Sequence, residues 1–507
     1  MNPRRATLVV VLILGLCHVH FSHALGETIR IGRTALPTSL GNPFTAAGRP
    51  SSGLWTAIFD ALTQFSRHGV LEPALALSWE NTAPTTWVFR LRPDVTFHNG
   101  TPFNAAAVVA TVEFLLSDAG TGLFVATELR NVTSIRALDA LTVEVRTELP
   151  DPILPKRMSI VYIVEPSALA EAGLDRFANQ PIGTGPFRLA DWGHTTLRTS
   201  FVAFEKSWRR PRVDRLEMVW LPDVSTRLQA LLSGHIDIME GFSPDDADAL
   251  AGRPYVHYSI PAPQVMSFAF RNVRDDDAPL KDQRVRQALN YAVNRQQIAQ
   301  VIGHGLVEAA SQGTVAGVVG YNPTLQPYPY DPGKAKALLA EAGYPDGFSL
   351  RVEVITGFVV SDSLVYQVAA KDLAAIGVKV ELQTVPFATW VGRFMRNDWG
   401  KTDAFSWTWT ALFYDSMRSI TRFSCAREKP FFCDAAFMED YYDAAREMDP
   451  AVRERKLMGL MAALQALAPA LWFTTVTHDY AIHEHIEEFE AGPMGILYDR
   501  IASSNPD

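Results

Sequence analysis

A twelve-residue stretch at 181–192, PIGTGPFRLADW, constrains the fold of this chain more than any other. Its two prolines fix φ at about −65°, whereas Gly183 and Gly185 can adopt positive φ values at no steric cost. Apolar and polar residues alternate after the second proline, which predicts a rigid turn that leads into a β-strand. We expect this turn to be the seam at which an inserted subdomain returns the chain to a main lobe.

The spacing of apolar residues predicts a mixed α/β protein. Leu54, Ile58, Leu62 and Phe65 recur at helical spacing, and Asn104 is a favourable N-cap. Helices are expected at 104–117, 224–232, 333–342, 362–376, 386–397, 434–448 and 451–467. Strands are expected at 28–32, 87–91, 141–145, 215–221, 235–239, 265–270, 350–355, 378–384, 403–410 and 471–476.

The domain organisation follows from length and element order. A chain of 507 residues fits two or three domains of ordinary size. We expect two α/β lobes, with the chain passing between them more than once and a further unit inserted in the first lobe. The expected divisions are 25–50, 181–268 and 477–507 for lobe I, 51–180 for the inserted subdomain, and 269–476 for lobe II.

The first 24 residues have the pattern of a secretory signal peptide. Two arginines precede an apolar run at 6–17, and Ser22-His23-Ala24 has small residues at both positions that a signal peptidase reads. A membrane anchor is the alternative, but a spanning helix needs about 20 apolar residues and histidines interrupt this run. Lipidation of Cys17 would require a small residue where Leu16 stands. We expect cleavage after Ala24 and a periplasmic location.

Charge and cysteine content restrict the possible partners. The formal net charge of −9 argues against a nucleic-acid partner, because neutralising phosphates requires an excess of Lys and Arg. Beyond the signal, Cys425 and Cys433 are the remaining cysteines. In an oxidising compartment such a close pair predicts a disulfide across a short loop, and two thiols alone make a poor metal site.

Enzyme signatures are scarce in this chain. There is no G-x-S-x-G elbow, no Walker phosphate loop and no G-x-G-x-x-G after a strand. His478, His483 and His485 invite a metal-site interpretation, but they lack the H-E-x-x-H spacing, and we interpret them as surface or packed residues. We therefore predict no catalytic residues, no cofactor and no metal site.

An aromatic segment is the best candidate for a binding site. Trp407 and Trp409 would share one face of the strand at 403–410, and Tyr414 follows just past its end. Burial in the core is the alternative for such residues. Because ligands of open α/β sheets bind beyond the carboxyl ends of the strands, we interpret the segment as part of a pocket.

Several blocks of the sequence resemble the extracytoplasmic solute-binding proteins of ABC importers, in the family that includes peptide, nickel and opine binders. They include PIGTGPFRL (181–189), RLQALLSGHIDIMEG (227–241) and YDPGKAKALLAEAGYPDGF (330–348), and the others lie at 75–116, 284–298, 423–434 and 468–473. The resemblance implies a two-lobe periplasmic-binding-protein fold of the cluster C type, with a subdomain inserted in the first lobe. It also implies a monomeric receptor that encloses a small solute or peptide and delivers it to permease subunits in the membrane.

The resemblance suggests where the ligand lies. Dipeptide binders of this family hold the charged peptide termini with an aspartate and an arginine, and the matching places here are TAL at 410–412 and a position near Val359. Neither carries a charge, so a simple dipeptide is disfavoured unless Asp415 or Arg418 substitutes. The expected ligand-binding residues are Leu36, Thr38, Asn42, Phe358, Val359, Trp407, Trp409, Tyr414, Asp415 and Arg418.

Three functions stay open at this point. A largely apolar and aromatic cleft suits a peptide held by its backbone or another small organic solute. Trp409 and Tyr414-Asp415-Ser416 partly match the nickel binder of the family, whose proline and metal-ligating histidine have no counterpart here, so a nickel chelate is the alternative. A secreted hydrolase on the same lobes is the third interpretation.

Overall fold

The computed structural model describes residues 27–37, 39–46, 52–274, 278–492 and 494–504. The expected signal peptide at 1–24 and the candidate ligand-binding residue Thr38 lie outside the described residues. Within the described part of the chain, no helix is both long enough and apolar enough to cross a membrane.

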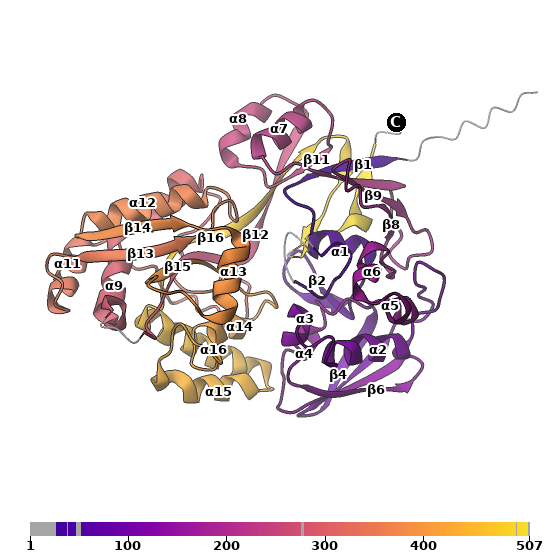
Figure 1. Ribbon diagram of the computed structural model, residues 1–507, viewed down its shortest axis with the longest axis horizontal. Helices are drawn as coiled ribbons and strands as arrows, with labels where there is room; N and C mark the ends of the chain where they lie inside the picture. The colour runs from indigo at the N-terminus through magenta and orange to yellow at the C-terminus, as the bar shows by residue number, and fades with distance from the viewer. Residues whose placement is uncertain (1–26, 38, 47–51, 275–277, 493, 505–507) are drawn as a thin grey trace, which may run out of the picture.

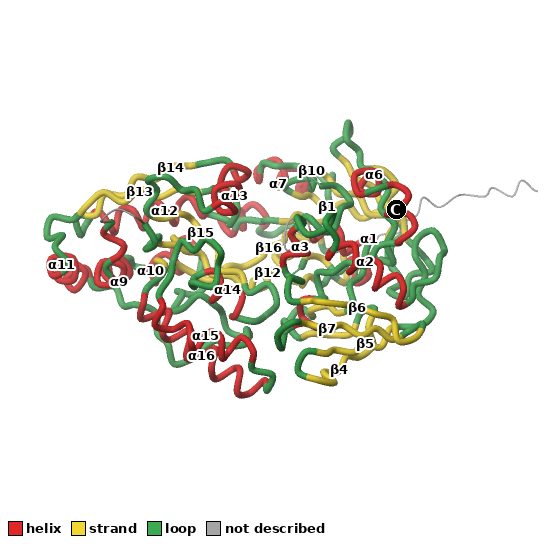
Figure 2. Tube along the Cα trace, turned by 60° about the horizontal axis from the view of Figure 1, so that its bottom comes forward, coloured by secondary structure: helices red, strands yellow, loops and turns green. Residues whose placement is uncertain are grey.

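One ten-stranded mixed sheet runs through the molecule in the order β14-β13-β15-β12-β16-β11-β1-β10-β9-β8. Figure 1 shows its two halves on either side of the long strands β12 and β16. We call the half with β13, β14 and β15 lobe II, and the half with β1 and β8 to β11 lobe I. The segment from α1 to α6, which we call the insert, carries a separate sheet in the order β4-β5-β7-β6, and Figure 2 shows these strands apart from the long sheet.

The elements have the following bounds. Those of lobe I are β1 (Thr28–Arg33), β8 (Phe187–Asp191), β9 (Arg198–Ala203), β10 (Arg215–Trp220), α7 (Val224–Leu232), β11 (Ile238–Glu240) and α8 (Ala247–Leu250). Those of the insert are α1 (Ser52–Ile58), β2 (Thr63–Phe65), β3 (Leu71–Pro73), β4 (Ala76–Ala83), β5 (Thr86–Leu91), α2 (Ala105–Leu116), α3 (Phe124–Thr127), β6 (Val132–Asp139), β7 (Thr142–Thr147), α4 (Leu154–Arg157), α5 (Pro166–Ala172) and α6 (Leu174–Asn179).

Lobe II has mostly alternating helices and strands, followed by helices that cover one end. They are α9 (Gln283–Ala292), α10 (Arg295–Gln297), α11 (Pro332–Glu341), β13 (Phe348–Val354), α12 (Asp362–Ala374), β14 (Val378–Thr384), α13 (Phe387–Arg396), β15 (Ala404–Thr410), α14 (Met417–Arg422), α15 (Met438–Arg446) and α16 (Pro450–Leu467). The short strands β17 (Ile486–Glu488), β18 (Ala491–Gly492), β19 (Gly495–Ile496) and β20 (Ala502–Ser503) follow near the C-terminus.

Two long antiparallel strands, β12 (Tyr255–Phe270) and β16 (Ala470–His483), join the lobes, and we call them the hinge strands. They pair along most of their length, so each belongs to both halves of the sheet. Their register shifts between Ala262 and Val265 and again before Ser267. Irregularities of this kind locally bend and twist a strand pair. The lobes are therefore joined by continuous backbone with one irregular region.

The parallel strands of each lobe end on a common edge. β1 pairs in parallel with both β10 and β11, and β13 pairs in parallel with both β14 and β15. The helix α12 connects β13 to β14, which confirms the strand–helix–strand unit expected at 350–384. Side chains that follow these strands are brought together at the edge, although they are far apart in sequence.

The turn at 181–192 leads into β8, as the sequence predicts, but its glycines serve a different purpose from the one expected. Neither Gly183 nor Gly185 has a positive φ. A Cβ on Gly183 would lie 2.2 Å from the carbonyl oxygen of Ile58, and one on Gly185 would lie 2.5 Å from the carbonyl carbon of the same residue. Gly185 N also donates to Ile58 O at 2.9 Å. The glycines allow the turn to lie directly against the end of α1.

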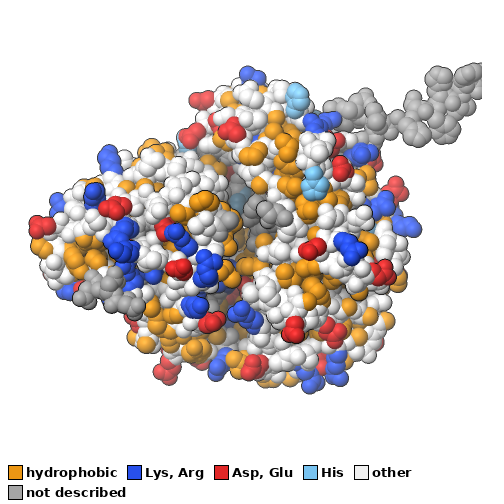
Figure 3. All heavy atoms as spheres, in the orientation of Figure 1, with side chains coloured by type: hydrophobic (Ala, Val, Ile, Leu, Met, Phe, Trp, Pro, Cys, Tyr) orange, Lys and Arg blue, Asp and Glu red, His pale blue; other side chains and the backbone are white. Residues whose placement is uncertain are grey.

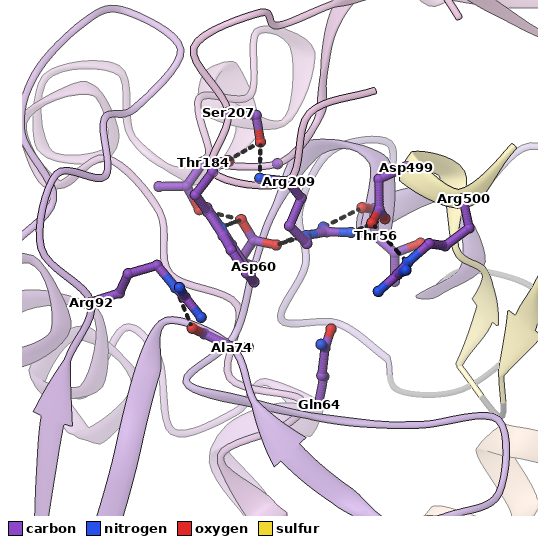
Figure 4. Close-up of polar contacts among 12 residues, drawn as sticks. Thr56, Asp60, Gln64, Ala74, Arg92, Thr184, Ser207, Arg209, Asp499 and Arg500 are labelled. Atoms are coloured by element: carbon purple, nitrogen blue, oxygen red, sulfur yellow. Dashed lines mark hydrogen bonds and ion pairs between the residues drawn. The ribbon is translucent and has the colours of Figure 1, made fainter. Parts of the chain in front are cut away.

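A buried ion pair fixes the insert to lobe I. Arg209 Nη2 lies 2.6 Å from Asp60 Oδ1, and Arg209 Nη1 lies 2.5 Å from Asp499 Oδ1 (Figure 4). Thr184 Oγ1 donates to the other oxygen of Asp60 at 2.8 Å. Burial would lower the pKa of Arg209, but the two carboxylates outweigh it and raise this pKa, so the guanidinium stays charged. The network joins the end of α1, the turn before β8 and the C-terminal segment.

Some expected elements have different bounds in the structure. The prediction that Leu62 and Phe65 continue the helix of Leu54 is wrong, because α1 ends at Ile58 and Thr63–Phe65 form β2. The strands expected at 265–270 and 471–476 are only parts of the hinge strands.

Candidate functional site

A cavity of about 590 Å³ lies between the lobes, where the ends of parallel strands meet the hinge strands. Lobe I contributes Thr34 after β1 and Gly241 after β11, and lobe II contributes Phe358 and Val359 after β13. Gln264 of the hinge strand β12 also lines it. The space-filling view shows the surface hollowed between the two lobes (Figure 3). The cavity therefore has walls from both lobes and from the hinge.

The lobe II wall is shaped by the buried carboxylate of Asp362. Its Oδ1 accepts from Gly357 N at 3.0 Å, and its Oδ2 accepts from Phe358 N at 3.0 Å and Val359 N at 3.2 Å. These bonds hold the loop at the start of α12 and leave Phe358 exposed. The Phe358 ring stacks on Phe387 at 5.8 Å, which gives this wall an apolar, aromatic surface.

The lobe I wall is fixed by a buried arginine. Arg227 Nη1 donates to Leu221 O at 2.6 Å and to Pro222 O at 2.9 Å, and its Nε donates to Glu240 O at 3.1 Å. Burial lowers the pKa of Arg227, although Glu240 and Asp223 oppose that effect. The guanidinium thus satisfies carbonyls at the ends of both β10 and β11, which positions the rim of the cavity.

A second set of contacts, which we call the junction, joins lobe II to the insert. Arg418 Nε donates to Glu128 Oε1 at 3.0 Å, and Lys156 Nζ donates to the carbonyl oxygen of Tyr414 at 3.2 Å. The Tyr414 ring lies 5.3 Å from that of Phe65, and burial raises the pKa of Tyr414 to about 12. In this structure lobe II is therefore in direct contact with the insert, beyond the hinge.

Asp415 is fully buried at the junction and is neutralised by the protein itself. Arg453 Nη2 donates to its Oδ1 at 2.8 Å, Arg453 Nη1 contacts its Oδ2, and Lys156 Nζ lies 3.9 Å from that oxygen. Burial lowers the pKa of Lys156 despite the opposing effect of Asp415. With Asp415 bound to Arg453 and Arg418 bound to Glu128, both charges are occupied by partners in the chain.

The two candidate tryptophans lie in the aromatic interior of lobe II. Trp409 is 1% exposed, its ring stacks on Phe423 at 3.7 Å, and its Nε1 donates to Ser267 Oγ at 3.1 Å. Trp407 is half-buried, with its ring 4.7 Å from that of Phe394. This is the core placement that the sequence left as the alternative.

The remaining candidates are distributed between these regions. Leu36 is half-buried against a hydrophobic core that extends through lobe I, the insert and part of lobe II, and the Oδ1 of Asn42 accepts from Phe44 N at 3.1 Å. The structure thus brings Phe358 and Val359 to the cavity, and Tyr414, Asp415 and Arg418 to the junction. Sequence reasoning missed Arg227 and Gln264, because no local pattern marks residues whose roles depend on distant strands.

The structure also shows where the cysteine and histidine residues singled out in the sequence lie. Cys425 and Cys433 form the expected disulfide. His483 and His485 lie with their rings 4.4 Å apart, and His485 Nε2 is 3.5 Å from Asp237 Oδ1. Across the described residues, no group of three or more His, Cys, Asp or Glu side chains is placed to hold a metal ion.

Residues 70–430 match the bacterial extracellular solute-binding proteins, family 5 (middle). The chain belongs to this family. It is 27% identical over 439 residues to the glutathione-binding protein GsiB of Pectobacterium atrosepticum, covering 85% of this chain and 81% of the relative. It is 30% identical over 359 residues to heme-binding protein A of Haemophilus influenzae, covering 65% of each chain.

Solved structures share the fold. The periplasmic binding protein DppA of Helicobacter pylori in complex with peptide STSA has a TM-score of 0.82 at 21% identity, covering 95% of this chain and 98% of that one. AgaA from A. tumefacien R10 in complex with agropinic acid has a TM-score of 0.81 at 24% identity, covering 94% and 99%. The family and the two-lobe fold expected from the sequence are confirmed, and so is the role of a solute-binding protein.

Proposed function

We propose that the protein captures a peptide or another small organic solute between its lobes and delivers it unchanged to the permease of an ABC importer. The observation that carries this proposal is the cavity lined by both lobes and by Gln264 of the hinge. A ligand that contacts both walls favours the closed arrangement by the difference between its affinities for the two states. Delivery without chemical change requires no catalytic group.

The same proposal covers the export of the protein, its location, its oligomeric state and its partners. We propose that residues 1–24 direct export, that the mature chain works in the periplasm as a monomer, and that it has no nucleic-acid partner. We also propose the domain bounds expected from the sequence. They are 25–50, 181–268 and 477–507 for lobe I, 51–180 for the inserted subdomain, and 269–476 for lobe II. The disulfide between Cys425 and Cys433 is consistent with an oxidising compartment.

Thermal-shift measurements on the purified mature protein test the proposal. The probes are a mixed tripeptide library, glutathione, agropinic acid, hemin and nickel–histidine, because proteins of this family or fold bind such solutes. Binding only to the native state raises the melting temperature. We expect one class to do so and to be recovered unchanged by mass spectrometry. Turnover of a bound probe would contradict the proposal.

A matched pair of variants locates the binding site. Phe358 and Tyr330 are both 47% exposed on lobe II, but only Phe358 lines the cavity. Phe358→Ala should weaken binding of the active probe roughly tenfold, because the lost aromatic contact is worth about 1.4 kcal/mol or more. Tyr330→Ala should leave it unchanged. Equal effects of the two substitutions would exclude this cavity as the site.

A further inference from the structure

A smaller cavity of about 50 Å³, which we call the side pocket, adjoins the cavity between the lobes. The two cavities share lining residues of lobe II and of the hinge strand β16, which are Val359, Val360, Ser361, Val476, Thr477 and Asp479. A site for one water molecule needs about 10–15 Å³, so the side pocket has room for a group of a few heavy atoms. A solute held between the lobes therefore lies beside the side pocket.

The rest of the wall of the side pocket is mostly aliphatic. It is formed by Met266, Ile298, Ile302, Leu306, Val307 and Val365, together with Gly303, Thr474 and Thr475. Met266, Ile298 and Val365 are buried, so they belong to the packed interior of lobe II. Burial of an aliphatic group against such a surface is favourable, because it removes apolar area from water.

Polar side chains in the wall are engaged by other parts of the chain. Of the described residues that line the side pocket, Asp479 alone is charged. Its Oδ2 accepts from Thr477 Oγ1 at 2.7 Å, and its Oδ1 lies 2.9 Å from His257 Nε2. Thr475 Oγ1 accepts from Glu308 N at 2.9 Å. A charged substituent in the side pocket would lose its water without gaining a free counter-charge, which is unfavourable.

A helix of an uncommon kind forms one side of the side pocket. Residues Ile298–Ile302 form the π-helix η3, and Gly303 N donates to Ile298 O at 3.1 Å, five residues back. Ile298 and Ile302 line the side pocket, whereas Val301 between them is 65% exposed. π-helices are rare and occur frequently at functional sites. The helix type is therefore a second observation, independent of the cavity, that points to a binding role for this wall.

We propose that the side pocket binds a small aliphatic group, such as an isopropyl group, carried by the transported solute. This proposal depends on the proposed function and adds the substrate class, which is a solute with an aliphatic branch. The branch needs no directional contact, because its binding comes from the removal of apolar surface from water. The polar remainder of the solute lies in the cavity between the lobes, where Gln264 and the loop after β13 line the wall.

Binding of xenon to the unliganded mature protein, measured by xenon NMR, tests the side pocket directly, because xenon occupies apolar cavities. Wild type should bind xenon saturably, and Ile302→Phe should weaken this binding roughly tenfold or more, because the larger side chain fills the space. Val301→Phe is the matched control, since it adds the same ring at the exposed neighbouring position. Ile302→Ala, which enlarges the side pocket, should bind xenon at least as strongly as wild type. No binding by wild type, or equal binding by the two phenylalanine variants, would overturn the proposal.

Competition between xenon and the solute separates this proposal from the proposed function. The active solute, whether released by denaturing native protein or found among the thermal-shift probes, should carry an aliphatic branch. It should displace xenon from wild type and should bind Ile302→Phe more weakly than Val301→Phe. A solute that binds wild type without displacing xenon, or that has no aliphatic group, would refute the assignment and leave the solute-binding function intact. Failure of every solute to bind would refute the proposed function itself, and this proposal with it.

Discussion

The Nε of Arg418 in lobe II donates to Glu128 Oε1 in the insert at 3.0 Å, so this ion pair joins lobe II to the insert. Arg157, which belongs to the insert, occupies the other oxygen of Glu128 at 2.8 Å. Burial would raise the pKa of Glu128, but Arg418 and Arg157 outweigh it and hold this pKa below its ordinary value of 4.5. The carboxylate is therefore ionised at neutral pH, where the pair favours contact between lobe II and the insert.

Glu128→Gln should shift the unliganded protein toward a more open arrangement. The substitution leaves Arg418 and Arg157 without their shared anion, which costs on the order of 1–3 kcal/mol. We expect a larger radius of gyration in small-angle X-ray scattering. The difference from wild type should shrink as the pH falls below 4.5 and disappear once the pH is below the lowered pKa of Glu128, because protonation then removes the same charge. Glu439→Gln, on an exposed site of α15, is the control, and an equal effect there would refute this role.

His98 should make the stability of the protein sensitive to mild acid. Its Nε2 lies 3.1 Å from Gly185 O, Gly183 N donates to its Nδ1 at 3.4 Å, and burial lowers its pKa from 6.5 to about 4. Between these two values the unfolded chain binds a proton that the folded chain does not. The free energy of unfolding should therefore fall as the pH falls from 6.5 toward 4, by up to about 3 kcal/mol.

Urea denaturation at several pH values measures this dependence. His98→Gln should flatten the pH profile of the free energy of unfolding. His194→Gln, at an exposed position, should not. Parallel profiles for wild type and His98→Gln would show that another group is responsible.

Gly183→Ala should destabilise the turn before β8. The added Cβ would lie 2.2 Å from the carbonyl oxygen of Ile58, and backbone at that position cannot move without disturbing α1. Overpacking of this kind typically costs about 1–3 kcal/mol. Gly122→Ala meets nothing within 4 Å and has no positive φ, so it should be neutral or slightly stabilising. Differential scanning calorimetry of the two variants tests whether the close contact between residue 183 and Ile58 requires a glycine. Equal melting temperatures of Gly183→Ala and Gly122→Ala would show that it does not.

Trp409→Ala should act mainly on stability. The side chain is 1% exposed and stacked on Phe423, so its removal leaves a large cavity and should cost about 3–5 kcal/mol. Trp407→Ala, at a half-buried site, should cost less. Solute affinity is measured in parallel at a temperature where both variants are folded. A Trp409→Ala protein with wild-type stability but lost affinity would support the pocket interpretation instead.

Local patterns in the sequence located most helices and strands. The helix α7 starts at Val224 after the capping residue Asp223, and β14 begins and ends as expected, because caps and alternation act over a few residues. The lengths of the two hinge strands were underestimated, because the sequence predicted only residues 265–270 of β12 and 471–476 of β16. Pro261 and Pro263 interrupt the pattern of β12, and the register shift next to them changes which side chains face the core.

The candidate site was harder to predict than the fold. Phe358 was found because it follows a predicted strand, and the ends of parallel strands share one edge. Sequence alone could not show that Asp415 is bound by Arg453, since the two residues meet only after α14 and α16 pack together.

The place of β16 in the long sheet has a consequence for how the protein is made. This strand is synthesised after β12 and after every strand of lobe II, yet it lies between β12 and β11 in the sheet. Until it emerges, β12 and β11 each expose an unpaired edge, and such edges attract other chains. A chain in which β16 has not yet joined the sheet is therefore prone to aggregation. Substitutions that weaken β16 should lower the yield of soluble protein more than equally destabilising changes in β8, which lies at the border of the sheet.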